Sequence, residues 1–135
     1  MSRFLIAVDG SSHSTKVAKA AIRQAAAYKQ VPELHLAYVH LPVPTLGGLI
    51  KPIAHEALQR YYREEGEAAL RRAKRLIERT GLVCTTHILV GPIAPSLARE
   101  ATKLKCDLIL MGTHGRGEVS GMRLGWRAAG TVRRA

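Results

Sequence analysis

The chain has 135 residues, of which 47% are hydrophobic and 23% charged, a composition that fits one globular domain and excludes a disordered or fibrous chain. Lys and Arg number 21 against 10 Asp and Glu, so the net charge is +11. The basic residues are spread along the chain, and one Trp, four Tyr and one Phe are too few for a base-stacking platform. We therefore expect no specific nucleic-acid partner.

Two cysteines, Cys84 and Cys106, cannot build a disulfide scaffold, which predicts a reducing, cytoplasmic setting. Both are expected to act as small buried hydrophobic residues. The chain opens directly into an apolar stretch ending at Asp9, which predicts no signal peptide. No apolar run approaches the roughly 20 residues of a membrane helix, so we expect no membrane partner.

Strand-like and helix-like segments alternate along the chain. The apolar run from Phe4 to Val8 predicts a buried first strand, and a polar turn then leads into a helix over 14–30. Further strands are expected over 33–41, 83–90 and 107–111, and further helices over 55–80, 92–105 and 125–134. The pattern predicts a single α/β domain, residues 1–135, with an open, mostly parallel sheet of four to five strands and helices on both faces.

Residues suited to binding an anion follow two of the predicted strands. The first strand ends in Asp9-Gly10-Ser11, and the fourth is followed by the glycine-rich stretch 112–117. Ligands of open parallel sheets collect beyond the C-terminal ends of the strands, so both segments belong to one candidate site. Two interpretations of each stay open. The glycines form a phosphate cradle or a turn that needs positive φ, and Asp9 binds a sugar hydroxyl or an adenine amine, or caps the first helix.

Two stretches of the sequence resemble the universal stress protein family. AVDGSSHSTKVAKAAI is similar to that family's first strand and helix, and GPIAPSLAREATKLKCDLILMGTHGRG is similar to its third helix, fourth strand and following loop. Nucleotide-binding members carry Gly-x-x-Gly, nine residues, then Gly followed by Ser or Thr, and Gly112, Gly115 and Gly125 match this spacing. The resemblance covers essentially the whole chain. It implies a Rossmann-like, adenine-nucleotide α-hydrolase-like fold that binds ATP or another adenine nucleotide.

The resemblance also implies roles for single positions. Asp9 corresponds to the acidic residue that contacts adenosine, and the backbone of Val39 to the group that reads the adenine edge. The positions implied beside the base and ribose are Ala7, Val8, Asp9, Val39, Met111 and Gly112. Those implied around the phosphates, with any Mg²⁺ carried by the nucleotide, are His114, Gly115, Arg116, Gly117, Gly125, Trp126 and Arg127.

Two departures from the family pattern change this expectation. Trp126 stands where nucleotide binders have Ser or Thr, so a hydrogen bond to the phosphates, worth about 1.5–3 kcal/mol, is expected to be lost, with Arg123 or Arg127 as substitute charges. The chain also stops at residues 133–135, where the family continues into a fifth strand. We therefore expect the fourth strand to be an uncovered sheet edge. Another chain covers this edge, or a homodimer forms another way.

The leading hypothesis is a cytoplasmic universal stress protein that binds an adenine nucleotide and acts as a stress-response or regulatory module. One alternative is a protein-interaction module that no longer binds nucleotide, and another is a slow ATPase. The sequence contains no GxSxG motif and no P-loop with its lysine, and no nucleophile with a paired base stands out. We therefore expect no metabolic enzyme.

Overall fold

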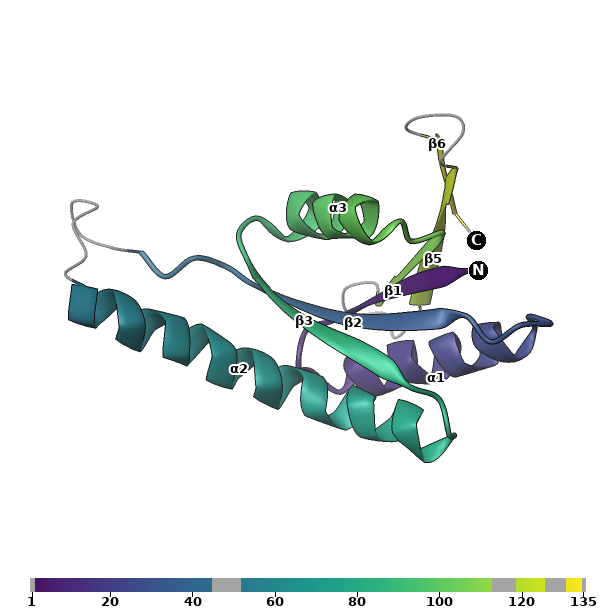
Figure 1. Cartoon of the computed structure of the whole chain (residues 1–135), viewed down its shortest axis with the longest axis horizontal. Coiled ribbons are helices and arrows are strands. Elements are labelled where there is room, and N and C mark those ends of the chain that lie inside the picture. The colour runs from purple at the N-terminus through teal and green to yellow at the C-terminus, as the bar shows by residue number, and fades with distance from the viewer. Residues whose placement is uncertain (1, 45–51, 113–118, 126–130, 135) are drawn as a thin grey trace.

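The computed structural model describes residues 2–44, 52–112, 119–125 and 131–134. Within these ranges the chain forms six strands and three helices, which alternate as far as β4 (Figure 1). In chain order they are β1 (Arg3–Val8), α1 (His13–Ala26), β2 (Glu33–His40), α2 (Pro52–Arg79), β3 (Cys84–Val90), α3 (Ile93–Leu104), β4 (Leu108–Gly112), β5 (Val119–Gly125) and β6 (Thr131–Arg134).

The strands form one sheet in the order β3-β2-β1-β4-β5-β6. β1 to β4 are parallel to one another, whereas β5 pairs with β4 and β6 pairs with β5, both in antiparallel fashion. β1 lies between β2 and β4 and is strongly apolar, as expected for a strand covered on both faces. The predicted open, mostly parallel α/β sheet is confirmed. The described sheet has two strands beyond the parallel four because β5 and β6 extend it.

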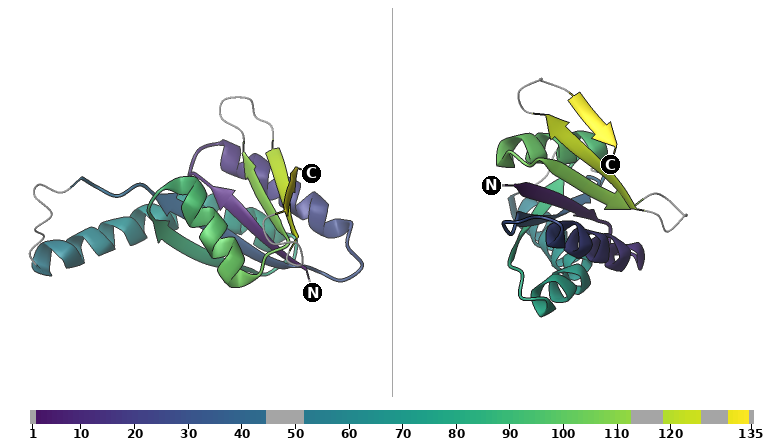
Figure 2. Two further views of the ribbon diagram at one scale, coloured as in Figure 1. Left: turned by 90° about the horizontal axis from the view of Figure 1, so that it is seen from above. Right: turned by 90° about the vertical axis from the view of Figure 1, so that its right-hand side faces the viewer.

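Helices cover both faces of the parallel strands (Figures 1 and 2). α1 and α2 pack on one face, where Val17, Ala73 and Ile77 meet Phe4 and Leu36 in the larger apolar core. α3 packs on the opposite face, where buried Leu97 and Ala101 belong to a smaller core. The alternation of side chains along each strand separates the two cores, since successive residues point to opposite faces.

The C-terminal part differs from the sequence prediction. A helix is expected over 125–134, but residues 119–125 and 131–134 form the antiparallel strands β5 and β6. The expectation that β4 is an uncovered edge is also wrong, because β5 pairs with β4 from Leu108 to Gly112. The edges of the described sheet are therefore β3 and β6.

A chain of polar side chains crosses the sheet beneath α3. Glu33 Oε1 lies 2.7 Å from His35 Nε2, and His35 Nδ1 lies 2.9 Å from His87 Nε2. His87 Nδ1 in turn lies 3.5 Å from Glu100 Oε1 on α3. These contacts satisfy the polar atoms of His35, whose side chain is 5% exposed. The histidines thus hold structural positions that link β2, β3 and α3.

Two bonds join the start of β1 to the start of β4. The Arg3 N–H donates to Asp107 Oδ2 at 2.7 Å, a contact between residues 104 positions apart, and the Asp107 N–H donates to the Arg3 carbonyl at 2.7 Å.

None of the helices in the described part of the chain has an apolar stretch long enough to cross a lipid bilayer.

Candidate functional site

A cavity of about 180 Å³ opens at the C-terminal ends of β1, β2 and β4. The chain passes from β1 through α1 to β2 on one side of β1, whereas β4 lies on the other side of β1 and follows α3, which covers the opposite face (Figure 1). Such a switch in strand order is where open α/β sheets bind ligands. The lining residues are Ala7, Val8, Asp9, His13, Ser14, Val17, Ala37, Val39, Ile93, Leu97, Met111 and Gly112.

The walls of the cavity are mostly aliphatic. Val39 and Ala37 come from β2, Met111 from β4, and Leu97 and Ile93 from α3. Apolar walls with a few polar groups at the rim are typical of small-molecule sites. An apolar protein cavity of about 150 Å³ holds a benzene molecule. A cavity of about 180 Å³ therefore has room for a flat ring system rather than for a whole nucleotide.

Asp9 follows β1 directly and carries the polar chemistry of the rim. Its Oδ1 accepts hydrogen bonds from the Ser11 N–H at 2.9 Å and the Ser11 hydroxyl at 2.6 Å. The Ser14 hydroxyl lies 3.4 Å from the same oxygen and accepts a bond from the Gly10 N–H at 3.2 Å. Within the described residues, Oδ2 makes no hydrogen bond. Asp9 therefore has one oxygen fixed by its own turn and one available as an acceptor.

The helix-capping interpretation of Asp9 is not what the structure shows. The N-cap of α1 is Ser12, which makes no side-chain cap bond, and the N–H of His13, at the start of the helix, donates to the Ser11 hydroxyl at 3.2 Å. Asp9 instead closes a short turn before the helix by accepting the N–H two residues ahead. Gly10 allows this turn, with a φ of 82° that favours glycine.

The charge of Asp9 follows from these contacts. Partial burial raises the pKa of the carboxyl group, but the bonds from Ser11 and Ser14 outweigh that effect and leave the pKa below its ordinary value of 3.8. Asp9 is therefore an anion at neutral pH. A carboxylate held in this way accepts hydrogen bonds from hydroxyl or amine groups of a ligand.

The structure brings together six of the residues that the sequence predicts for the site. They are Ala7, Val8, Asp9, Val39, Met111 and Gly112, and all of them line the cavity. His114, Gly115, Arg116, Gly117, Trp126 and Arg127 lie outside the described residues. Their predicted placement around the phosphates stays a prediction.

Gly125 is the predicted site residue that the structure does not bring to the cavity. Val119 at the start of β5 pairs with Gly112 at the cavity end of β4, whereas Arg123 pairs with Leu108 at the opposite end. At about 3.4 Å per residue, Gly125 is roughly 20 Å along the strand from Val119. It pairs with Thr131 of β6, so its match to the family spacing does not place it beside Gly112 here.

Sequence reasoning does not single out His13 as a site residue. It begins α1, lines the cavity, and its Nδ1 is buried without a hydrogen-bond partner among the described residues. The available signal is its place in the polar segment after β1, but only the rotation of the helix decides which of these side chains faces the cavity. Ile93 and Leu97 are missed for the same reason on α3.

Comparison with known proteins agrees with the fold. Residues 1–135 match the model of the universal stress protein family. The chain belongs to this family. It is 32% identical over 133 residues to a universal stress protein of Methanocaldococcus jannaschii, covering 98% of this chain and 76% of that protein. It is 33% identical over 132 residues to a universal stress protein of Thermus aquaticus, covering 97% and 90%.

Solved structures of universal stress proteins share the fold. A family member from Burkholderia pseudomallei is 30% identical and covers 84% of this chain and 82% of its own, with a TM-score of 0.63. A universal stress protein in complex with cAMP is 20% identical, covers 80% and 73%, and has a TM-score of 0.56. An Arabidopsis thaliana member with AMP bound is 14% identical, covers 87% and 80%, and has a TM-score of 0.58.

Proposed function

We propose that this universal stress protein binds an adenine nucleotide in the cavity at the ends of β1, β2 and β4, and acts as a stress-response or regulatory module. The observation that carries the proposal is the pairing of apolar walls with a single ionised carboxylate, Asp9, which keeps Oδ2 available at the rim. The cAMP and AMP complexes of proteins with the same fold support it.

The chemistry of the cavity suits the parts of a nucleotide differently. A purine ring is flat and largely apolar on its faces, which matches the aliphatic walls contributed by Val39 and Met111. Ribose hydroxyls and the adenine amine are donors, which match Asp9 Oδ2. His13 Nδ1 is a further buried polar atom without a partner among the described residues. The proposal assigns the base and sugar to these groups.

The phosphates are assigned to the glycine-rich end of β4 and the segment after it. Gly112 lies at the rim, and 113–118 carry the predicted cradle residues. The proposal lets any Mg²⁺ arrive bound to the phosphates of the nucleotide. Because Trp126 replaces a hydroxyl donor, we expect AMP to bind nearly as tightly as ATP.

Gly112 offers a direct test of the site. A Cβ at this position meets Val17 Cγ2 at 3.4 Å and His13 Cβ at 3.8 Å, which is ordinary contact, and its φ lies outside the left-handed region. Gly112→Ala is therefore tolerated, whereas the larger side chain of Gly112→Leu projects into the cavity mouth. We expect isothermal titration to show binding of ATP, ADP or AMP to the wild type and Gly112→Ala, and loss of binding in Gly112→Leu.

The alternatives give different results in the same experiment. If the wild type shows no heat and no thermal shift with any of the three nucleotides, the proposal fails and the protein-interaction module is favoured. Release of phosphate from ATP that Gly112→Leu abolishes favours the slow ATPase. Native mass spectrometry of the protein as purified provides an independent readout, because a bound nucleotide adds its own mass.

We also propose that the protein self-associates as a homodimer. An uncovered β4 cannot be the reason, because β5 covers that strand. The support is instead β3, an edge strand with a regular ladder to β2 and no Asp, Glu, Lys or Arg from Cys84 to Val90. Edge strands are ordinarily protected by charge, proline or bulges. Sedimentation that shows a monomer at every concentration contradicts this proposal.

A further inference from the structure

A second hollow, of about 460 Å³, lies between α1 and α2. We call it the arginine groove, because four of its lining residues are arginines of α2. Its lining consists of Thr15, Ala68, Arg71, Arg72, Arg75, Leu76 and Arg79. No acidic side chain is among these residues. The groove and the nucleotide cavity have no lining residue in common.

The spacing of the arginines produces a row of charge. Arg71, Arg75 and Arg79 follow each other at intervals of four residues and so lie on one side of α2. With a rise of about 1.5 Å per residue, the row extends for roughly 12 Å. Arg72 broadens it at one end. All four residues are exposed.

These arginines have no counter-ion within the described part of the chain. The ion pairs there involve Arg3, His35 and His87, and none includes an arginine of the groove. Like charges four residues apart on a helix destabilise it by a few tenths of a kcal/mol per pair. A bound anion removes this repulsion.

We propose that the arginine groove binds a linear anion made of several phosphate groups. The guanidinium group is a planar fork that pairs with phosphate oxygens through two parallel hydrogen bonds. The Thr15 hydroxyl adds a neutral donor on the α1 side of the groove. A row of such donors suits an anion whose charges are also arranged in a row.

The lining disfavours two other kinds of ligand. Single-stranded nucleic acid is held by aromatic side chains on which its bases stack, and no aromatic residue lines the groove. A peptide helix docks through apolar anchors in a groove, whereas the carbon surface here comes from Ala68 and Leu76 between charged neighbours. A chain of phosphates without bases needs neither a stacking surface nor an apolar anchor.

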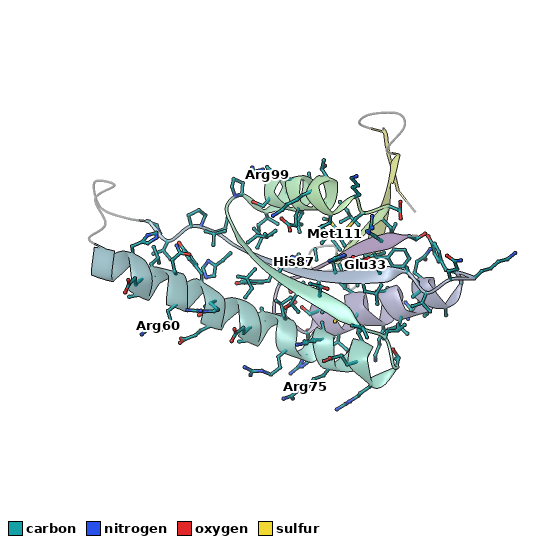
Figure 3. The ribbon with its side chains drawn as sticks, viewed as in Figure 1. Glu33, Arg60, Arg75, His87, Arg99 and Met111 are labelled. Carbon is teal, nitrogen blue, oxygen red and sulfur yellow. The ribbon has the colours of Figure 1, made fainter. Side chains whose placement is uncertain are left out.

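The experiment uses inorganic tripolyphosphate, which has no base to enter the nucleotide cavity. Its affinity is measured by isothermal titration for the wild type and for Arg71→Gln combined with Arg75→Gln. The matched control combines Arg60→Gln with Arg63→Gln, two exposed arginines on the same helix outside the groove. Figure 3 shows that Arg60 and Arg75 both lie on the outer side of α2, towards opposite ends.

The groove variant is expected to weaken tripolyphosphate binding by about tenfold or more, and the control by less than about threefold. Equal losses in the two arginine pairs, an unchanged affinity in the groove variant, or no binding by the wild type overturns the proposal. A single-stranded RNA or a poly-glutamate peptide that binds the groove more tightly overturns the assignment to a phosphate chain.

Discussion

Gly66 of α2 lies so close to Ile88 of β3 that a Cβ on the glycine falls 2.6 Å from Ile88 Cγ1 and 2.7 Å from Cγ2. Because both branches of the isoleucine lie within this range, rotation about χ1 exchanges one clash for another. The helix approaches β3 this closely only because residue 66 has no side chain. Glycine is costly inside a helix, by about 1 kcal/mol relative to alanine, and here close packing explains its presence.

Gly66→Ala is therefore expected to destabilise the protein even though alanine favours the helix. Overpacking of about 1–3 kcal/mol, less about 1 kcal/mol of helix propensity, gives a net loss of about 1 kcal/mol. Combining it with Ile88→Ala restores space, so the two changes should cost less together than the sum of the single changes. Urea unfolding of the two single variants and the double variant measures this coupling. Strict additivity contradicts the packing explanation.

A second prediction concerns His87. Burial and the neighbouring His35 lower the pKa of His87, with Lys103 contributing in the same direction and Glu100 opposing them. The unfolded chain therefore takes up a proton more readily than the folded protein. The contribution of neutral His87 to stability is present above the ordinary pKa of 6.5. It is lost as the pH falls from there towards the lower pKa that His87 has in the folded protein.

The measurement is urea unfolding at pH values on both sides of 6.5 for the wild type and His87→Gln. We expect the wild type to lose more stability on acidification than the variant. His55→Gln, which removes an exposed histidine at the start of α2, is the control and is expected to keep the wild-type slope. A wild-type protein that becomes more stable as the pH falls through this range contradicts the assignment.

Asp9→Asn tests the acceptor of the proposed nucleotide site. The substitution removes the negative charge while keeping one oxygen and the shape of the side chain. A hydrogen bond to a charged group is worth about 1.5–3 kcal/mol, so AMP affinity is expected to fall by about tenfold or more. Titration of AMP into the wild type and the variant measures the change, and equal affinities exclude Asp9 as a ligand contact.

The pH dependence of nucleotide binding also tests whether Asp9 contacts the ligand. Because the pKa of Asp9 is lowered, the folded protein keeps the carboxylate ionised to below pH 3.8. The stabilisation it gives is present above the ordinary pKa and is lost as the pH falls through the folded value. At pH 5, where most unperturbed histidines are protonated, the contact between Asp9 and the ligand is therefore expected to persist.

Lys105 gives a prediction about stability alone. It ends α3 in the left-handed conformation, with a φ of 57°, and its N–H bonds back to the carbonyls of Ala101 and Thr102. This conformation costs a non-glycine residue about 1–2 kcal/mol, a cost that glycine avoids. Glycine loses more conformational entropy on folding, which cancels about 0.5–1 kcal/mol of that gain. Lys105→Gly is expected to stabilise the protein by about 0.5–1 kcal/mol. Lys103→Gly, inside the helix, is expected to destabilise it by about 1 kcal/mol, and urea unfolding compares the two.

The parallel part of the fold is predictable because its signals are local. The apolar run from Phe4 to Val8 is typical of a strand buried on both faces, and the predicted ends of most elements lie within a few residues of those observed. Tyr61 shows the limit of periodicity. It stands next to Tyr62 on α2, but it is 42% exposed while Tyr62 is 5% exposed. Adjacent residues of a helix point about 100° apart, and here only Tyr62 of the two tyrosines is buried.

The C-terminal strands are not predictable in the same way. Gly121 and Gly125 interrupt the segment that becomes β5, and glycine weakens a strand signal. Its structure depends on pairing with β4, which is a tertiary contact. The sequence predicts only those site residues that lie at the ends of strands. Asp9, Met111 and Gly112 follow from sheet topology, whereas His13 depends on the rotation of a helix.

The cavity also ties ligand recognition to the order in which the chain is synthesised. Its walls begin at Ala7 and end at Gly112, and the pairing of β1 with β4 closes a separation of about one hundred residues, as the bond between Arg3 and Asp107 shows. A nascent chain on the ribosome that has not yet exposed residue 108 lacks one side of the pocket. A ligand of this cavity therefore meets its complete walls only after the chain is synthesised at least as far as Gly112 and β4 has paired with β1.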